Sequence, residues 1–268
     1  MMAAGMEMDN EFFTLESQDD VFLVRYKAGA LRHASDLTGI ASFFEAMERL
    51  AKSRKARAVV FLAPPERIGG AELVDIYRKA LSAKREDYVL QRLFNLVNNY
   101  VLLLASMDKI TVSAERGRVD AFFFNLSLAC DYRLVAENAV YENPCLELGL
   151  VSKGGGGFFL SKMLGSKRAA EVMLRTRMVP EEGLRLGLAD KIVPCEELEQ
   201  AAWEAANAFL AKPADALLNV RRLLKGDPAE LRKSLELEDL LIMNRVNAPD
   251  FQELLRSIPV SEEAVAAC

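Results

Sequence analysis

The chain has 268 residues, of which 51% are hydrophobic, and a formal net charge of −5 at pH 7. This size and apolar content predict one core domain over residues 1–195 and a C-terminal helical region over 196–268 that packs on the core or on a neighbouring subunit. The acidic balance, with a pI near 5.3, excludes the basic surface that general nucleic-acid binding requires.

The amino terminus does not resemble a targeting segment. Residues 1–13 contain no basic stretch followed by an apolar core and a cleavage site. No window of the chain approaches the roughly 20 apolar residues of a membrane helix. Four scattered cysteines, none in a CxxC pair, fit a reducing compartment. We therefore expect a cytoplasmic protein with unpaired cysteines and no membrane partner.

Strands and helices alternate in the first part of the chain. Residues 12–16 and 21–27 predict two paired strands, and residues 36–53 predict a helix because their apolar side chains recur at helical spacing. The apolar run 58–62 predicts a strand that is covered on both faces. Prolines and glycines in 63–70 predict a loop at the carboxyl end of that strand, where α/β folds often place ligands.

A long helix is predicted over residues 86–107, where apolar residues form a wide stripe. Strands follow at 109–114 and 129–136, with a tight strand-to-helix junction at 117–124 between them and a short strand near 140–141. The rest is mostly helical, with helices predicted at 158–164, 166–174, 180–186, 196–210 and from 214 onward, and a short strand at 190–193.

Several short motifs follow one another between residues 57 and 194. They are Arg57 to Leu62, Gly69-Gly70-Ala71-Glu72, Lys109 to Ala114, Gly117, Ala129-Cys130-Asp131, Asn143-Pro144, Leu148-Gly149-Leu150, Gly154 to Gly157, and the helical region that ends at Pro194. In order and spacing this series resembles the crotonase (enoyl-CoA hydratase/isomerase) superfamily. The resemblance covers nearly the whole chain and is specific between Cys130 and Pro194.

The resemblance implies an α/β fold, a spiral of β-β-α units with a C-terminal helical trimerisation region, assembled as a homotrimer or a dimer of trimers. It also implies an acyl-CoA ligand, so that coenzyme A enters as part of the substrate and no cofactor is bound permanently. In the family, two backbone amides form an oxyanion hole that stabilises charge on the thioester carbonyl. Carried over to this chain, they are the amides of Ala71 and Phe122. Asp120 suits either a helix N-cap or a catalytic carboxylate.

The expected proton-transfer residues depart from the family pattern. Hydratases of the family use two glutamates, and the matching positions here hold Asn125 and Cys145. Asn125 cannot take a proton near neutral pH, and Cys145 has no cationic neighbour in sequence that would favour its thiolate. Conventional hydration is therefore disfavoured. Glu147 is the preferred single proton carrier, because an extended segment would place it on the same face as Cys145.

The remaining charged residues give weaker signals. Arg25, Lys27 and Arg32 follow the second predicted strand, near the place where the family binds the nucleotide end of coenzyme A; ordinary surface charges are an equal alternative. Lys153 begins the glycine loop and is expected to be solvated. His33 is the only histidine, which excludes a metal site built from several histidines, and we expect no metal.

Three functions remain open. The first is an enzyme that stabilises an acyl-CoA enolate by isomerase-, decarboxylase- or atypical lyase-type chemistry, and this is the preferred interpretation. The second is a non-catalytic member that binds acyl-CoA or serves as an oligomer subunit. The third is a structural protein whose pocket is closed by the aromatic residues 122–124.

Overall fold

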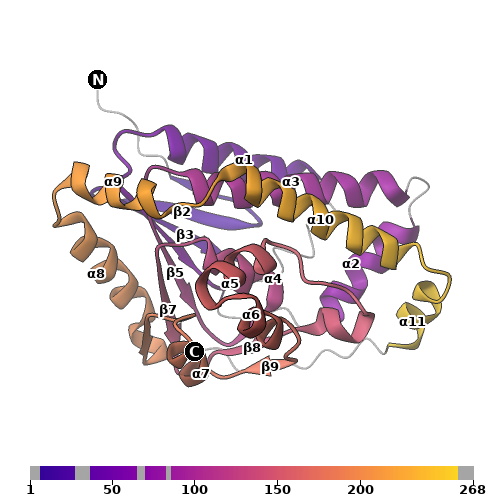
Figure 1. The fold of residues 1–268 in the computed structure, drawn as a ribbon. Coiled ribbons are helices and arrows are strands. Elements are labelled where there is room, and N and C mark those ends of the chain that lie inside the picture. Colours follow the sequence, from indigo (N-terminus) through magenta and orange to yellow (C-terminus); the bar gives the residue numbers. More distant parts are fainter. Residues whose placement is uncertain (1–6, 28–36, 65–69, 83–85, 259–268) are drawn as a thin grey trace.

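The computed structural model describes residues 7–27, 37–64, 70–82 and 86–258. In this part of the chain a seven-stranded sheet forms the centre of the molecule (Figure 1). In spatial order its strands are β1 (Met8–Asp9), β2 (Phe13–Gln18), β3 (Val21–Tyr26), β4 (Ala58–Leu62), β5 (Ile110–Glu115), β7 (Tyr132–Ala136) and β10 (Lys191–Val193).

One strand of this sheet, β2, runs opposite to the others. β2 runs antiparallel to β1 and β3, whereas β3, β4, β5, β7 and β10 are parallel. Parallel neighbours need long connections. Helix α1 (Leu37–Lys52) joins β3 to β4, and helices α2 (Gly70–Ser82) and α3 (Glu86–Ser106) join β4 to β5.

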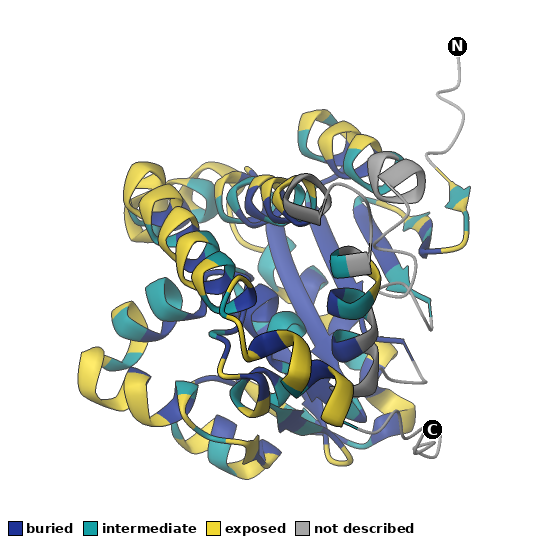
Figure 2. Ribbon diagram, turned by 90° about the vertical axis from the view of Figure 1, so that its right-hand side faces the viewer, coloured by how far each residue is buried: buried dark blue, intermediate teal, exposed yellow. Residues whose placement is uncertain are grey.

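Side chains alternate between the two faces of the sheet. Val59 and Phe61 of β4 belong to a core cluster with residues of α1 and α3. Val60 and Leu62 belong to a second cluster on the opposite face, which α8 (Leu198–Leu210) covers. All five residues of β4 are buried, and Figure 2 shows the central strands in the colour of buried residues. The prediction of a strand covered on both faces is confirmed.

A smaller layer sits beside the main sheet and contains the strand-to-helix junction predicted at 117–124. β6 (Arg118–Asp120) leads directly into α4 (Ala121–Leu128), and β6 pairs with β8 (Val140–Glu142). The remaining elements of this layer are the 3-10 helix η2 (Pro144–Leu148), α5 (Gly156–Leu164), α6 (Ser166–Met173), β9 (Arg177–Met178) and α7 (Pro180–Arg185).

The last helices reach back across the molecule. After the 3-10 turn η3 (Cys195–Glu197) and α8, α9 (Ala214–Leu224) leads to α10 (Pro228–Val246), which lies along α3, and to α11 (Phe251–Ser257) (Figure 1). Leu231 and Leu235 of α10 are buried against the core. Other apolar side chains of α9 and α10 are exposed: Val220, Leu223, Leu224, Leu237, Leu240 and Leu241.

The α/β architecture is confirmed, and three local expectations are wrong. Helix α2 follows the Pro/Gly loop directly, although no helix was predicted between that loop and residue 86; residues 65–69 of the loop lie outside the described residues. The segment 144–148 is a 3-10 helix rather than an extended strand. Cys195 is disulfide-bonded, so the cysteines are not all unpaired, while Cys130 and Cys145 are free.

None of the helices in the described part of the chain combines the length and the apolar character that crossing a bilayer would need. The cytoplasmic location stays a prediction.

Candidate active site

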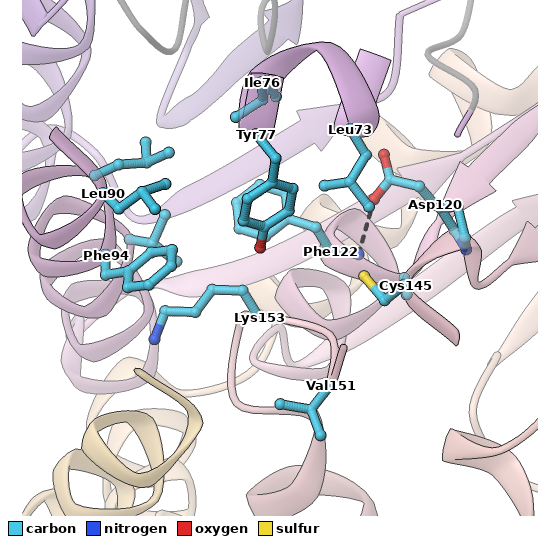
Figure 3. A pocket seen from close by; sticks show the side chains of 14 residues that line it. Leu73, Ile76, Tyr77, Leu90, Phe94, Asp120, Phe122, Cys145, Val151 and Lys153 are labelled. Atoms are coloured by element: carbon cyan, nitrogen blue, oxygen red, sulfur yellow. Dashed lines mark hydrogen bonds between the residues drawn. The ribbon is translucent and has the colours of Figure 1, made fainter. Parts of the chain in front are cut away.

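A cavity of about 80 Å³ lies between α2, α3, the first turn of α4, η2 and the loop before α5 (Figure 3). The carboxyl end of β6 and the amino ends of α2 and α4 border it, so side chains distant in sequence meet there. Most of its wall is apolar and comes from α2 and α3: Leu73, Ile76, Leu90, Leu93, Phe94 and Val97. Polar atoms at its surface come from Tyr77, Asp120 and Cys145.

Phe122, a predicted oxyanion-hole residue, lies at the start of α4. Its amide donates a hydrogen bond of 2.8 Å to Oδ1 of Asp120, and the Phe123 amide donates to the same oxygen at 3.2 Å. Asp120 is therefore the N-cap of α4, as one of the two sequence interpretations expected. Its carboxylate also borders the cavity (Figure 3). In this structure, the Phe122 amide is therefore already bonded to a carboxylate.

The Phe122 ring lines the cavity without filling it. The ring packs edge-on against Phe123 with 5.4 Å between ring centroids, and the cavity volume remains beside it. The aromatic run thus narrows the cavity and supplies part of its wall.

Ala71, the second predicted oxyanion-hole residue, is the second residue of α2. The amides of the first turn of a helix have no intrahelical partner and carry the positive end of the helix dipole. Leu73, Ile76 and Tyr77 of the same helix line the cavity. The first turns of α2 and α4 therefore border the same cavity. The assignment of the Ala71 and Phe122 amides as an oxyanion hole stays a prediction.

Cys145 faces the cavity from η2 and is 7% exposed. Burial, with a smaller contribution from the Asp120 charge, raises the pKa of its thiol to about 12. The thiol therefore stays protonated near neutral pH and cannot act as a general base.

Glu147 lies two residues further along η2 and is exposed. The expectation that it shares a face with Cys145 is wrong, because the segment is helical and residues two positions apart point in different directions. Glu147 is not among the described residues that line the cavity. The geometric reason for expecting Glu147 to carry a proton, its place on the same face as Cys145, therefore no longer holds.

Asn125 is buried and serves a structural contact. Its Nδ2 donates to Oγ of Ser152 and to the carbonyl oxygen of Lys153, both at 3.0 Å. A Cβ on Gly156 would lie 2.4 Å from Asn125 Oδ1, so only glycine fits there. Asn125 thus fixes α4 to the glycine loop and lies behind the cavity wall, where it borders a second, smaller pocket.

Lys153 is buried rather than solvated. Its stem lines the cavity and its ammonium points away toward α10 (Figure 3). The ammonium donates to Asn98 Oδ1 and to the Leu235 carbonyl oxygen, and it lies 2.5 Å from Asp239 Oδ1. Lys153 therefore joins the glycine loop to α3 and α10.

Glu238 of α10 binds the same loop and was not anticipated from the sequence. Its carboxylate accepts the Gly154 amide at 3.1 Å and the Gly155 amide at 3.0 Å, and lies 3.8 Å from the Lys153 ammonium. Burial raises the pKa of Glu238 to about 7, although Lys153 and the two amides act in the opposite direction. The glycine loop is therefore held by the carboxyl group of Glu238, whose pKa lies near neutral pH.

The residues expected to meet the nucleotide end of coenzyme A are paired with acids or lie outside the described residues. Arg25 donates to Glu16 at 2.7 Å and to Glu199 of α8 at 3.2 Å. Lys27 forms an ion pair with Asp9. Arg32 lies outside the described residues. A contact of these residues with a nucleotide stays a prediction.

In the described residues, no group of three or more His, Cys, Asp or Glu side chains could hold a metal ion.

A family model described as enoyl-CoA hydratase/isomerase matches residues 21–255 of the chain. The chain belongs to the enoyl-CoA hydratase/isomerase family. The resemblance to the crotonase superfamily is thereby confirmed.

Relatives within the enoyl-CoA hydratase/isomerase family carry different reactions in their names. 4-Chlorobenzoyl coenzyme A dehalogenase-2 from Arthrobacter sp is 22% identical over 245 residues, which cover 90% of this chain and 88% of the relative. Ethylmalonyl-CoA decarboxylase from Rattus norvegicus is 30% identical over 193 residues, which cover 70% of this chain and 60% of the relative. The crystal structure of enoyl-CoA hydratase from Bacillus halodurans superposes with a TM-score of 0.79 at 21% identity, covering 92% of this chain and 100% of that chain.

Sequence reasoning missed two residues of this family member's site, Tyr77 and Glu238. Tyr77 and its helix were overlooked because α2 follows a loop rich in proline and glycine. Asp120 was interpreted as either a cap or a catalytic carboxylate, and it both caps α4 and lines the cavity. Glu238 gave no local signal, since it reaches the glycine loop from a helix more than eighty residues away in the sequence.

Proposed function

We propose that the chain binds an acyl-CoA thioester in the cavity and stabilises its enolate through the backbone amides of Ala71 and Phe122. The observation that carries this proposal is the cavity itself, which the first turns of α2 and α4 border. Amides at such positions need no reorganisation as negative charge develops on a carbonyl oxygen, and they can contribute several kcal/mol in a dry site.

Asp120 has to move for this function. Its carboxylate holds the Phe122 amide, so a thioester oxygen must displace it before the amide can stabilise an enolate. The freed carboxylate would lie beside the acyl group. Asp120 is the one carboxylate among the described residues that line the cavity, which makes it a better placed proton carrier than Glu147.

We favour isomerase-, decarboxylase- or atypical lyase-type chemistry over hydration. Adding water requires both a base for oxygen and an acid for carbon. Asn125 is committed to the glycine loop and Cys145 stays a neutral thiol, so neither replaces a family glutamate. Isomerisation needs a single group that removes and returns one proton, and decarboxylation forms the enolate without a base. The relatives' names include a dehalogenase and a decarboxylase as well as a hydratase, so chemistry other than hydration is compatible with the family.

A second candidate is a non-catalytic member that binds acyl-CoA or acts as an oligomer subunit. The bond between Asp120 and Phe122 favours it, because a carboxylate that never leaves the amide would prevent enolate stabilisation.

Ligand binding and turnover together test the two candidates. Thermal unfolding is followed with free coenzyme A, butyryl-CoA and malonyl-CoA, and turnover is measured with crotonyl-CoA, a 3-enoyl-CoA and malonyl-CoA. Stabilisation together with isomerisation or decarboxylation supports the enzyme. Stabilisation without turnover of any of the three substrates favours the non-catalytic binder. The absence of stabilisation by every thioester would contradict both.

We further propose that the chain assembles as a homotrimer or a dimer of trimers. Leu223 and Leu224 of α9 are 84% and 81% exposed, and contiguous exposed apolar side chains usually mark an interaction surface. Sedimentation velocity should give a trimer or hexamer for the natural chain and a smaller species for Leu223→Asp. The matched control is Lys167→Asp at an exposed position of α6, and a monomeric natural chain would contradict the proposal.

A further inference from the structure

Tyr77 places a phenol group inside the candidate active site. The residue lies on α2 and is 6% exposed. Its ring packs edge-on against Phe251 of α11 at 5.9 Å between centroids, which fixes the orientation of the ring. The hydroxyl is at the end turned into the cavity, between Phe94 and Phe122 and above the stem of Lys153 (Figure 3).

No hydrogen bond joins the Tyr77 hydroxyl to the described residues; the hydroxyl reaches open space in the cavity and is not one of their buried polar atoms that lack a partner. Elsewhere in the core, the hydroxyls of Tyr26 and Tyr100 lie 2.6 Å apart and bond to each other. A ligand that fills the cavity would displace water and bury this Tyr77 hydroxyl, which costs free energy unless the ligand supplies an acceptor. A group that enters the cavity is therefore the natural partner of Tyr77.

The surroundings fix the hydroxyl as a neutral donor. Burial, with a smaller contribution from Cys145, raises the pKa of Tyr77 well above its usual range. The phenol keeps its proton, so it donates a hydrogen bond to an acceptor on the ligand and does not act as a base.

The charges at the cavity select among possible acceptors. The Asp120 carboxylate borders the same small space, and it would repel a ligand carboxylate strongly in surroundings of low dielectric constant. Lys153 does not offset this repulsion, because its ammonium is turned toward Asp239 and Asn98 outside the cavity. An uncharged oxygen therefore fits better than an anionic one, and the apolar wall from α2 and α3 suits a hydrophobic body around it.

We infer that Tyr77 is a specificity-determining residue whose hydroxyl donates a hydrogen bond to an uncharged oxygen, a hydroxyl or a keto group, on the acyl part of the ligand. The inference rests on the proposed function and narrows its substrate class to hydrophobic acyl-CoA thioesters that carry such an oxygen; of the proposed reactions it favours isomerase- or lyase-type chemistry over decarboxylation of a thioester that carries a carboxylate.

Dissociation constants for matched thioester pairs test the inference. The pairs are butyryl-CoA with 3-hydroxybutyryl-CoA and with acetoacetyl-CoA, and benzoyl-CoA with 3- and 4-hydroxybenzoyl-CoA. They are measured by calorimetry on the natural chain, on Tyr77→Phe and on Tyr132→Phe. Tyr132→Phe is the control, because Tyr132 packs against Phe209 on the opposite face of the sheet. Both substitutions remove one hydroxyl and keep the ring.

At least one oxygenated thioester should bind the natural chain more tightly than its unsubstituted partner. Tyr77→Phe should weaken that binding by roughly 2- to 12-fold, as expected for a neutral hydrogen bond, and leave the partner's affinity unchanged. Tyr132→Phe should change neither value. If thioesters bind but no pair shows an advantage that Tyr77→Phe removes, the inference on Tyr77 is overturned while the proposed function stands. If no thioester binds, both are overturned.

Discussion

Replacing Glu238 with glutamine should change how the stability of the protein depends on pH. Glu238 is buried, accepts the Gly154 and Gly155 amides, and has a pKa raised to about 7 from an ordinary value of 4.5. Between these two values the folded chain holds a proton on Glu238 that the unfolded chain has released. The free energy of unfolding therefore falls as pH rises through this window, and it levels off above about pH 7.

The size of the effect follows from the shift. One pKa unit corresponds to about 1.4 kcal/mol, so the interval between 4.5 and about 7 corresponds to a loss of about 3 kcal/mol across the window. Glutamine cannot titrate, and its amide oxygen can still accept the two backbone amides. Glu238→Gln should therefore remove this part of the slope, whatever it does to stability at a single pH.

Urea denaturation at intervals from about pH 4.5 to about pH 8 measures this difference. The natural chain should lose about 3 kcal/mol relative to Glu238→Gln over that range. Glu236→Gln is the matched control, because Glu236 lies on the same helix but is exposed; it should follow the natural chain. Parallel curves for the natural chain and Glu238→Gln would refute the reasoning, since they would mean that Glu238 does not hold its proton more strongly when folded.

Three further substitutions test the site. Asp120→Asn can still cap α4 and should keep stability and thioester affinity, whereas Asp120→Ala should cost about 1 kcal/mol of unfolding free energy. If Asp120 carries the proton, Asp120→Asn should also lower isomerase turnover by roughly 100-fold or more. Full turnover in that variant would show that Asp120 takes no part in the reaction. The Cys145 thiol, with a pKa raised to about 12, should resist iodoacetamide at neutral pH in a mass-spectrometric assay, and Cys145→Ser should keep most of the turnover; rapid alkylation would show that a thiolate is present. Glu147→Gln should leave thioester affinity and turnover unchanged, because the side chain is exposed and outside the cavity lining; a large loss of turnover would restore Glu147 as proton carrier.

Much of the fold could be predicted because it follows from patterns of neighbouring residues, such as apolar runs, helical stripes and caps. The buried run of β4 and the stripe of α3 were located to within a residue or two. The cap Asp120 could be recognised because capping depends on neighbouring residues. Helix α2 was missed, since its apolar residues follow a loop whose prolines and glycines dominate the local signal.

The candidate site was less predictable because its decisive contacts are distant in sequence. An alternating pattern placed Cys145 and Glu147 on one face, but a proline at the start of η2 and Gly149 at its end set a 3-10 turn instead. Gly149 has a φ of 65°, and a Cβ there would lie 2.9 Å from Nε of Arg245. Sequence alone also gave no reason to bury Lys153, because its partners Asn98 and Asp239 come from two other helices.

The contacts of Lys153, Glu238 and Phe251 have a consequence for biosynthesis. All three connect the cavity wall to α10 or α11, which are the last described helices to leave the ribosome. A nascent chain that ends before α10 has the central sheet but lacks the supports of the glycine loop and of the Tyr77 ring. The supports of the cavity wall therefore form only after α10 and α11 have been synthesised, and a product truncated before them would have a folded centre and an unsupported cavity.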